Sequence, residues 1–196
     1  MRLSTGMIFL LSLLAGFHSL TAAALEILNP AKPIPAIALV AKNLRKQTAE
    51  IATAPDGKPA LKLTWNNSDA NKLEFFFEPG ADIPEFKKAI VDVEVYLTEN
   101  SFSNFFYIRL IDSQVEIFQF RKFLRFDELP MGWQTFQFEI NAEDLNNNPD
   151  IRTWGRNANR KINYPAKFFG FCIDFSRTRG SGDIYIGKIS IRPEKQ

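Results

Sequence analysis

Histidine and cysteine are almost absent from this chain of 196 residues, which has one of each. The histidine is His18, and it lies in an N-terminal segment that we expect to be removed. A mature protein without imidazole excludes Ser-His-Asp and Cys-His catalysis and any histidine-ligated metal site. The lone Cys172 excludes an intrachain disulfide, so packing must stabilise the fold.

An excess of charge of one sign is also lacking, because 24 Lys and Arg residues face 22 Asp and Glu residues. A protein whose main partner is a nucleic acid favours a basic stripe that neutralises phosphates. The balance of charges therefore predicts that nucleic acid is not a partner.

Long apolar runs are missing except near the N-terminus, where residues 7–17 are mostly apolar. This run is shorter than the roughly 20 residues of a membrane helix. It follows a basic start at Arg2 and precedes Ala22-Ala23-Ala24. This order is typical of a secretory signal peptide. We therefore predict a signal peptide over residues 1–24 with cleavage near Ala24, and a secreted or periplasmic protein that does not span a membrane after cleavage. The alternative is an uncleaved membrane anchor.

No segment shows a long helical period. Instead, apolar and polar residues alternate with period two in the segments 61–65, 73–77, 91–97, 106–110, 136–140 and 169–175. Such alternation indicates strands with one buried face. Turn residues such as Pro55-Asp56-Gly57 and Pro79-Gly80 separate the segments. In residues 169–175 the alternation places Phe169, Phe171 and Ile173 on the core side of the strand and Cys172 on the opposite side. Because Cys172 lies inside a predicted strand, we interpret it as buried and unreactive.

We divide the mature chain into an N-terminal segment over residues 25–45 and a β-sandwich domain over residues 46–196. The first contains Pro30, Pro33 and Pro35, which favour an extended, linker-like backbone. Within it, the stretch beginning at Ile37 fits either a short helix or an edge strand. The short, punctuated strands of the second predict an all-β sandwich or barrel.

Three sequence pieces, spread over about residues 49–192, carry a family resemblance. They are Asp56-Gly57-Lys58-Pro59-Ala60-Leu61-Lys62-Leu63, Gly132-Trp133-Gln134-Thr135-Phe136 and Gly182-Asp183-Ile184-Tyr185-Ile186-Gly187-Lys188-Ile189-Ser190-Ile191. In this order the pieces resemble the jelly-roll carbohydrate-binding modules, which are galactose-binding-like domains. The resemblance implies a jelly-roll β-sandwich of two antiparallel sheets and a polysaccharide or oligosaccharide ligand.

The closing strand departs from that family pattern. In the family an acidic residue often stands there and helps to hold a structural calcium ion, which needs oxygen ligands. This chain has Gly187 and Lys188 instead. We therefore expect no metal site and no cofactor.

Two regions offer the aromatic and polar side chains that bind sugars. The first is the long segment 146–165, predicted as a loop, with Trp154, Arg156 and Tyr164. The alternative is that its Trp folds back as a lid over the end of the sandwich. Long loops in compact domains are often functional.

The second region is the non-core face of the middle strands. Alternation places Tyr96, Tyr107 and Arg109 there, together with Gln137 and Glu139. The alternative is an ordinary solvated strand face. We take Trp65 and Trp133 as structural.

Basic residues also gather in the C-terminal third of the chain. They are Arg152, Arg156, Arg160, Lys161, Lys167, Arg177 and Arg179. If they converge, an acidic polysaccharide would suit them better than a neutral one. The alternative is that they are simply solvated.

A catalytic role rests on one pair of carboxylates. Asp92 and Glu94 share a strand face, which places their Cα atoms about 6.6 Å apart. That distance permits glycosidase chemistry but is common to every Asp-x-Glu strand. We therefore predict a carbohydrate-binding protein that is not an enzyme. The alternatives are a cell-envelope structural or protein-interaction sandwich, and a histidine-free glycan-active enzyme. The sequence specifies neither the glycan nor the oligomeric state.

Overall fold

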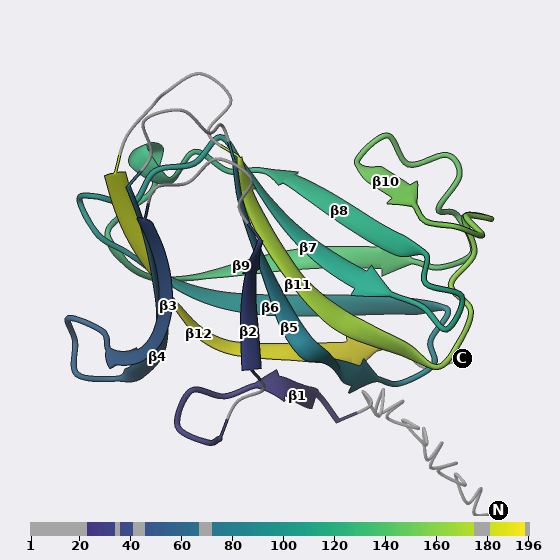
Figure 1. Ribbon diagram of the computed structural model, residues 1–196, viewed down its shortest axis with the longest axis horizontal. Coiled ribbons are helices and arrows are strands. Elements are labelled where there is room, and N and C mark those ends of the chain that lie inside the picture. Colours follow the sequence, from purple (N-terminus) through teal and green to yellow (C-terminus); the bar gives the residue numbers. More distant parts are fainter. Residues whose placement is uncertain (1–22, 34–35, 41–45, 67–71, 175–180, 195–196) are drawn as a thin grey trace, which may run out of the picture.

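The computed structural model describes residues 23–33, 36–40, 46–66, 72–174 and 181–194. These residues form twelve strands and one short 3₁₀ helix, Phe126–Glu128, arranged as two antiparallel sheets packed face to face (Figure 1). The predicted all-β sandwich is confirmed. The signal-peptide prediction falls outside the described residues, apart from Ala23 and Ala24. The described residues include no helix of the length and apolarity that a membrane crossing needs.

The first sheet, called sheet A here, has the strand order β3-β4-β12-β6-β9. A further strand, β1, pairs with β12. The bounds are β1 Leu25–Leu28, β3 Lys46–Thr53, β4 Pro59–Asn66, β6 Lys88–Leu97, β9 Gly132–Asn141 and β12 Ser181–Pro193.

The second sheet, sheet B, has the order β10-β8-β7-β11-β5-β2. The bounds are β2 Ala36–Val40, β5 Lys72–Ile83, β7 Phe105–Ile111, β8 Ile117–Phe123, β10 Ile151–Trp154 and β11 Ala166–Asp174. In Figure 1 the viewer looks onto sheet B, with β5, β11, β7 and β8 crossing the molecule in front of sheet A.

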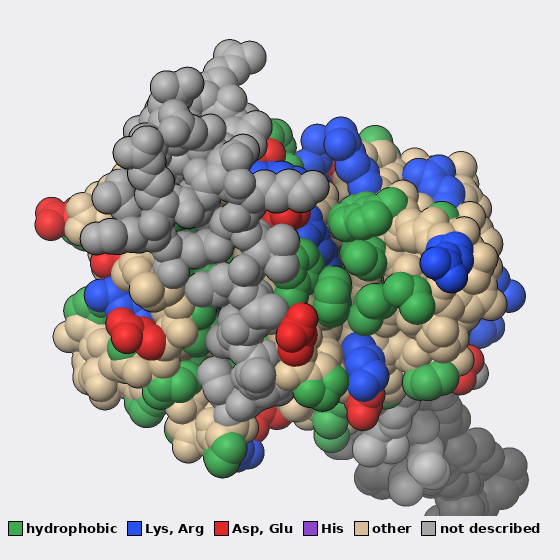
Figure 2. Space-filling model, viewed as in Figure 1, with side chains coloured by type: hydrophobic (Ala, Val, Ile, Leu, Met, Phe, Trp, Pro, Cys, Tyr) green, Lys and Arg blue, Asp and Glu red, His purple; other side chains and the backbone are tan. Residues whose placement is uncertain are grey.

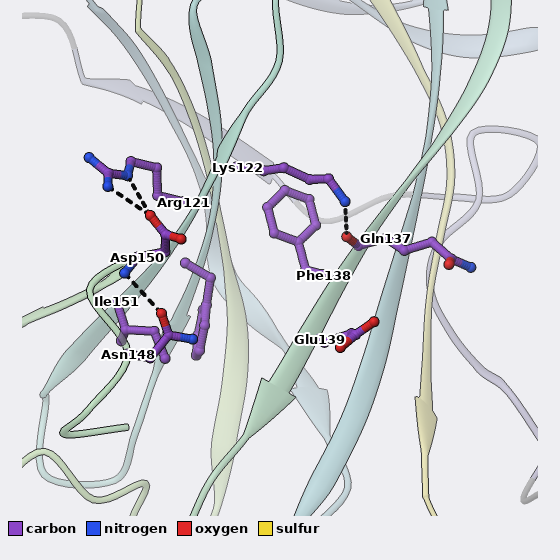
Figure 3. Close-up of a pocket in the computed structure, with 9 residues that line it drawn as sticks. Arg121, Lys122, Gln137, Phe138, Glu139, Asn148, Asp150 and Ile151 are labelled. Atoms are coloured by element: carbon purple, nitrogen blue, oxygen red, sulfur yellow. Dashed lines mark hydrogen bonds and ion pairs between the residues drawn. The ribbon is translucent and has the colours of Figure 1, made fainter. Parts of the chain in front are cut away.

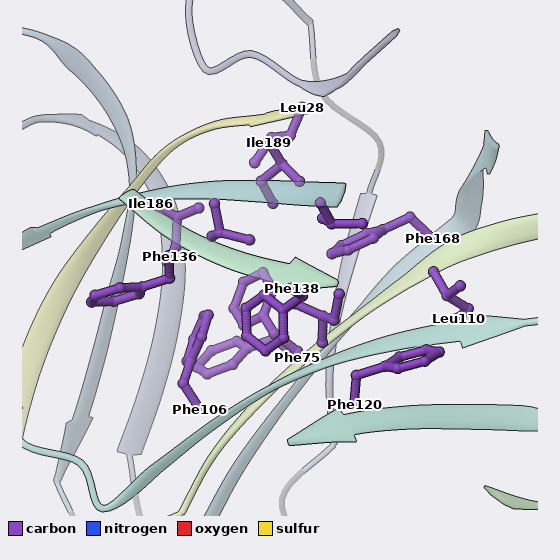
Figure 4. Close-up of a cluster of buried hydrophobic side chains, with 14 of the residues drawn as sticks. Leu28, Phe75, Phe106, Leu110, Phe120, Phe136, Phe138, Phe168, Ile186 and Ile189 are labelled. Carbon is purple, nitrogen blue, oxygen red and sulfur yellow. The ribbon is translucent and has the colours of Figure 1, made fainter. Parts of the chain in front are cut away.

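Phenylalanine rings fill the space between the sheets. The ring of Phe106 on β7 lies 6.0 Å from that of Phe136 and 6.1 Å from that of Phe138, both on β9 of the opposite sheet. Figure 4 shows these rings pointing toward one another from the two layers. Trp65 is buried in the same core, as predicted. Burying such rings removes large apolar areas from water, which is the main stabilising term of the fold.

A β-bulge in β11 changes which residues face outward. The pairing with β5 and β7 shifts between Phe168 and Gly170, so Phe168 and Phe171 both point into the core. The prediction that Phe169 faces the core is therefore wrong; its ring packs at a tilt against that of Phe76 on the outer face, with the ring centroids 4.7 Å apart. Gly170 has φ 150°, and a Cβ there would collide with the Phe75 carbonyl.

Two segments outside the predicted strand pattern also form strands. From the segment 25–45, β1 joins sheet A and β2 joins sheet B, so this segment contributes to the sandwich rather than preceding it as a linker. Of the stretch from Ile37 to Lys46, residues 37–40 follow the edge-strand alternative, since β2 ends the order of sheet B, and residues 41–45 lie outside the described residues. Likewise, the predicted loop 146–165 contains β10, which pairs with β8.

Candidate functional site

The outer face of sheet B carries a group of aromatic side chains, which we call the aromatic face. It consists of Phe76 on β5, Phe105 and Tyr107 on β7, Phe123 on β8, Trp154 on β10 and Phe169 on β11. Phe123 is 63% exposed and Trp154 is 39% exposed. Figure 2 shows hydrophobic side chains gathered over this sheet, beside basic ones. An apolar patch of this kind on the solvent side of a sheet is a candidate contact surface for a ligand or partner.

Arg109 lies at the centre of the aromatic face and is only 3% exposed. Its guanidinium carbon is 5.2 Å from the ring centroid of Phe76 and 5.2 Å from that of Trp154. Cation–π contacts of this kind hold rings and guanidinium in a fixed arrangement. Trp154 therefore reaches from the edge strand β10 across the sheet to β7.

Glu74 neutralises the charge of Arg109, and Gln119 helps to orient its guanidinium group. The Arg109 Nε donates to Gln119 Oε1 at 2.8 Å, and one terminal nitrogen lies 2.5 Å from Glu74 Oε1. Partial burial works against ionisation of Glu74, but the hydrogen bond and charge of Arg109, helped by Lys72, lower the pKa of that carboxyl. The result is a charged, hydrogen-bonded network set among aromatic rings.

Cys172 lies under this network, on the same side of β11. It is buried, as predicted, and burial raises the pKa of its thiol to about 12. A protonated thiol is a poor nucleophile and a poor metal ligand. Cys172 is therefore a buried packing residue beneath the aromatic face.

A second aromatic group extends the face along β7 and β8. The rings of Phe105 and Phe123 are 5.3 Å apart, and the Arg121 guanidinium lies 5.2 Å from the Phe105 ring. The Tyr107 hydroxyl donates to Asp174 at 3.2 Å. Burial and the Asp174 charge raise the pKa of Tyr107, so its phenol stays protonated.

Two buried carboxylates hold the loop that follows Trp154. Glu116, which is 0% exposed, accepts the backbone N–H groups of Asn159 (2.7 Å) and Arg160 (3.0 Å). Asp112 accepts the backbone N–H and the side-chain amide of Asn163. These bonds fix the loop after Arg156 against the β7–β8 turn, while the pairing of β10 with β8 holds the chain before it.

The structure brings together only part of the predicted site. Trp154, Tyr107 and Arg109 lie on the aromatic face, and Arg156 lies at its β10 end. Tyr164 lies elsewhere, where its hydroxyl bonds the backbone N–H and C=O of Phe86, both at 3.1 Å, so its role is structural.

Tyr96 is the clearest correction, because it lies on the outer face of sheet A. Its ring packs against Trp133 at 5.5 Å and Tyr185 at 6.2 Å. The predicted single non-core face is thus two faces on opposite sides of the sandwich. Strand alternation separates core from non-core residues, but it does not say to which sheet a strand belongs.

The sequence patterns did not indicate four residues of the aromatic face, which are Phe76, Phe105, Phe123 and Phe169. They also did not indicate Glu74 and Gln119, the partners of Arg109. Phe76 had a usable signal, since it is a large apolar residue at an outward position of an alternating strand. Phe169 had none, because the bulge that turns it outward depends on the pairing of three strands.

An indole fills the space beside Gly187, where the family pattern often has an acidic calcium ligand. At Gly187 a Cβ would lie 2.6 Å from the Trp133 ring. Trp133 Nε1 donates to Asp56 Oδ2 at 2.7 Å, and Glu94 Oε2 accepts the Lys188 N–H at 3.1 Å. Across the described part of the chain, no group of three or more His, Cys, Asp or Glu could hold a metal ion. The residues at this position therefore do not fit calcium.

The carboxylates considered for catalysis lie on the outer face of sheet A. Asp92 accepts from Arg192 Nε at 2.8 Å and from Gln137 Nε2 at 2.9 Å. Glu94 accepts the Lys188 N–H, as noted above. Both carboxylates are thus engaged as hydrogen-bond acceptors by neighbouring groups of sheet A.

A depression lies between β8 and β9, the edge strand of sheet A (Figure 3), and has a volume of about 220 Å³. Arg121 pairs with Asp150 at 2.7 Å, and Lys122 Nζ donates to the Gln137 carbonyl at 2.8 Å. Its aromatic lining, Phe120 and Phe138, is buried. Several of its polar groups satisfy one another and it offers no exposed ring, so the aromatic face is the stronger candidate.

Neither a protein-family model nor a curated protein sequence matches the chain. Solved structures do. One is a family 11 carbohydrate-binding module from Clostridium thermocellum in complex with a β-1,3-1,4-mixed-linked tetrasaccharide (TM-score 0.59, 9% identity, 90% of this chain and 99% of that one). Another is the solution structure of CtCBM11 (TM-score 0.57, 8% identity, 87% and 95%).

A third similar structure is an exo-β-agarase (TM-score 0.56, 18% identity, covering 89% of this chain). The chain spans 26% of that enzyme's length, so the likeness concerns a part of it. At these identities the comparisons show the fold. The predicted jelly-roll sandwich and its resemblance to the carbohydrate-binding modules are confirmed.

Proposed function

We propose that this protein is an exported, non-catalytic carbohydrate-binding protein whose aromatic face binds a glycan chain. The observation that carries the proposal is the set of partly exposed rings of Phe76, Trp154 and Phe169 around Arg109, Glu74 and Gln119. Sugar rings present apolar C–H faces that pack on aromatic rings, while their hydroxyls bond guanidinium, carboxylate and amide groups. Both kinds of contact lie side by side here.

The fold supports this proposal over a purely structural role. Two of the similar structures named above are carbohydrate-binding modules, and one of them holds a tetrasaccharide. A fold hosts many functions, so the weight rests on the aromatic face itself.

The side chains available support binding without catalysis. The mature chain has no imidazole if the predicted signal peptide is removed, and Asp92 is engaged by Arg192 and Gln137. We also propose that binding needs no calcium, because Trp133 fills the position beside Gly187. Export to the periplasm or the medium rests on the N-terminal sequence.

Affinity electrophoresis against neutral and acidic polysaccharides tests the proposal. We expect at least one polysaccharide to retard the protein, and Trp154→Ala to weaken that binding at least about tenfold, or about 1.4 kcal/mol, as for a central aromatic contact. Met131→Ala is the matched control, because Met131 is exposed and precedes β9 of sheet A.

The proposal fails if no polysaccharide retards the wild-type protein, or if Trp154→Ala binds as tightly as Met131→Ala. The exposed rings would then favour the second candidate, a sandwich that docks a protein partner on the same face. Release of reducing sugar by the wild type that disappears in Asp92→Asn or Glu94→Gln would instead support an enzyme.

A further inference from the structure

We infer that the glycan is acidic, carrying carboxylate or sulfate groups that Arg152 and Arg156 bind on either side of Trp154. This inference rests on the proposed function, because it uses the same aromatic face. It adds the chemical class of the ligand.

Arg152 is placed next to the aromatic face by strand geometry. It lies two residues before Trp154 on β10, so both side chains leave the strand on the same side, and both are exposed. In the pairing with β8, Arg152 lies opposite Gln119, the residue that orients Arg109. An anionic group beside the Trp154 ring would therefore be within reach of Arg152.

Arg156 follows Trp154 after one glycine. It lines an open depression of about 630 Å³ together with Ser113, Gln114, Val115 and Asn157. The backbone there is rigid, because Glu116 and Asp112 hold the loop at Asn159, Arg160 and Asn163. Arg156 thus lies beside the β7–β8 turn, on the other side of Trp154 along the chain from Arg152.

The other basic side chains of the face are already paired. Arg109 and Lys72 bond Glu74, and Arg121 pairs with Asp150. Among the residues that the structure describes, Arg152 and Arg156 have no ion-pair partner, and the side chains of Arg160 and Lys161 in the same loop have none either. This end of the face therefore carries uncompensated positive charge. Arg177 and Arg179, named with this group in the sequence, lie outside the described residues.

The nearby carboxylates do not neutralise that charge at the surface. Asp112 and Glu116 are buried and accept backbone N–H groups, and Asp150 is bound by Arg121. Figure 2 shows Lys and Arg side chains around the hydrophobic patch toward β10. Carboxylates turned inward and guanidinium groups turned outward produce a positive surface beside an aromatic ring.

Such a surface suits an acidic polysaccharide better than a neutral one. The planar guanidinium fork matches two oxygens of a carboxylate or sulfate group, and a charge-assisted bond is stronger than a bond to a hydroxyl. A neutral glycan would use the rings and the Arg109 network but gain little from Arg152 and Arg156.

Two matched pairs of polysaccharides test the inference: polygalacturonate against its methyl ester, and a sulfated galactan against the same galactan after desulfation. We expect the wild type to bind at least one acidic form about tenfold more tightly than its neutral partner at low salt, and added NaCl to shrink this preference. Arg152→Ala/Arg156→Ala should lose the preference while keeping the neutral affinity.

The control variant is Lys87→Ala/Lys188→Ala, which removes the same charge from exposed positions outside the aromatic face. It should keep the preference, and circular dichroism should show all variants folded. Equal affinity of the wild type for both members of both pairs overturns the inference and leaves the proposed function standing. A preference for the acidic form that persists in Arg152→Ala/Arg156→Ala also overturns the inference and leaves the proposed function standing. Absence of binding to every polysaccharide overturns the proposed function as well.

Discussion

Arg109 shows how one residue links stability and function in this protein. A guanidinium that is 3% exposed must have its charge compensated, and Glu74 and Gln119 provide the partners. The flat Arg109 guanidinium also packs against the rings of Phe76 and Trp154. The polar network therefore positions the rings that are proposed to meet the ligand.

Replacing Arg109 by Met should lower the free energy of unfolding by about 2–3 kcal/mol. The lost partner leaves Glu74 with an uncompensated charge, and the partial exposure of Glu74 keeps the cost below that of a fully buried pair. Urea unfolding measures the change. Arg109→Met/Glu74→Leu should recover part of the loss, because both charges are then gone. A double variant less stable than Arg109→Met would contradict the pairing.

Glu74 also gives the fold a predictable pH dependence. Its pKa is lowered from 4.5 in the folded state, so the unfolded state binds this proton more readily. The stabilisation it provides is complete above about pH 4.5 and is lost as the pH falls through the lower folded pKa. Thermal unfolding between pH 6 and pH 3 should therefore show a shallower decline for Glu74→Gln than for the wild type. Parallel declines would argue against an ionised Glu74–Arg109 pair.

At the scale of a single element, the bulge of β11 determines where Phe169 lies. Gly170→Ala should destabilise the protein by more than about 3 kcal/mol, because a strained backbone and a collision with the Phe75 carbonyl combine. Gly57→Ala is the matched control, since Gly57 has φ 91° but no atom within 4 Å of the Cβ position. That variant should cost about 1–2 kcal/mol. Equal losses in urea unfolding would show that the close approach to β5 does not matter.

Glu116 holds the loop after β10 in place by accepting two of its backbone N–H groups. In Glu116→Gln the amide group replaces one acceptor oxygen by a donor, so one of the N–H groups of Asn159 and Arg160 loses its partner. Leaving one buried donor unsatisfied costs about 1–3 kcal/mol. Hydrogen exchange should become faster in this loop while the core strands keep their protection. Unchanged exchange at Asn159 and Arg160 would contradict the role given to Glu116.

The elements of the fold were predictable where side chains alternate cleanly. The strands containing Leu73, Val93 and Phe136 follow from period two, because their inward residues are apolar and most outward ones are not. The edge strand β10 was predicted as part of a loop, and the stretch containing β2 was left open between a helix and an edge strand, because a short edge strand is fixed by its neighbour rather than by its own pattern. The bulge at Gly170 likewise reflects pairing with β5 and β7, which no local pattern shows.

For the molecule as a whole, the two outer faces of the sandwich differ in how they use aromatic residues. On sheet A, Trp133, Tyr96 and Tyr185 pack on one another, and Trp133 is tied to Asp56. On sheet B, the rings surround a polar network and part of their surface is exposed. Half of the predicted site residues, Trp154, Tyr107 and Arg109, lie on the sheet B face, and Arg156 lies at its end. Assigning them required the sheet order, which joins strands far apart in the sequence.

The packing on sheet A predicts that calcium does not stabilise this protein. Trp133 occupies the space beside Gly187, and Asp56 accepts its indole N–H. The midpoint of thermal unfolding should therefore be the same, within about 1 °C, in EDTA and in millimolar CaCl₂, since a ligand bound only by the folded state would raise it. A calcium-dependent rise of several degrees would overturn this reading of the site.

Three tryptophans at distinct places in the fold allow a direct test of whether the aromatic face of sheet B binds the glycan. Trp154 lies on that face, Trp133 on the outer face of sheet A and Trp65 in the core. Each indole N–H gives its own signal in a proton–nitrogen correlation spectrum. Titration with the polysaccharide that retards the protein should shift the Trp154 indole and the backbone amides around Phe76 and Arg109, leaving the Trp133 and Trp65 indoles in place. A shift centred on Trp133 and Tyr96, with Trp154 unchanged, would contradict the account.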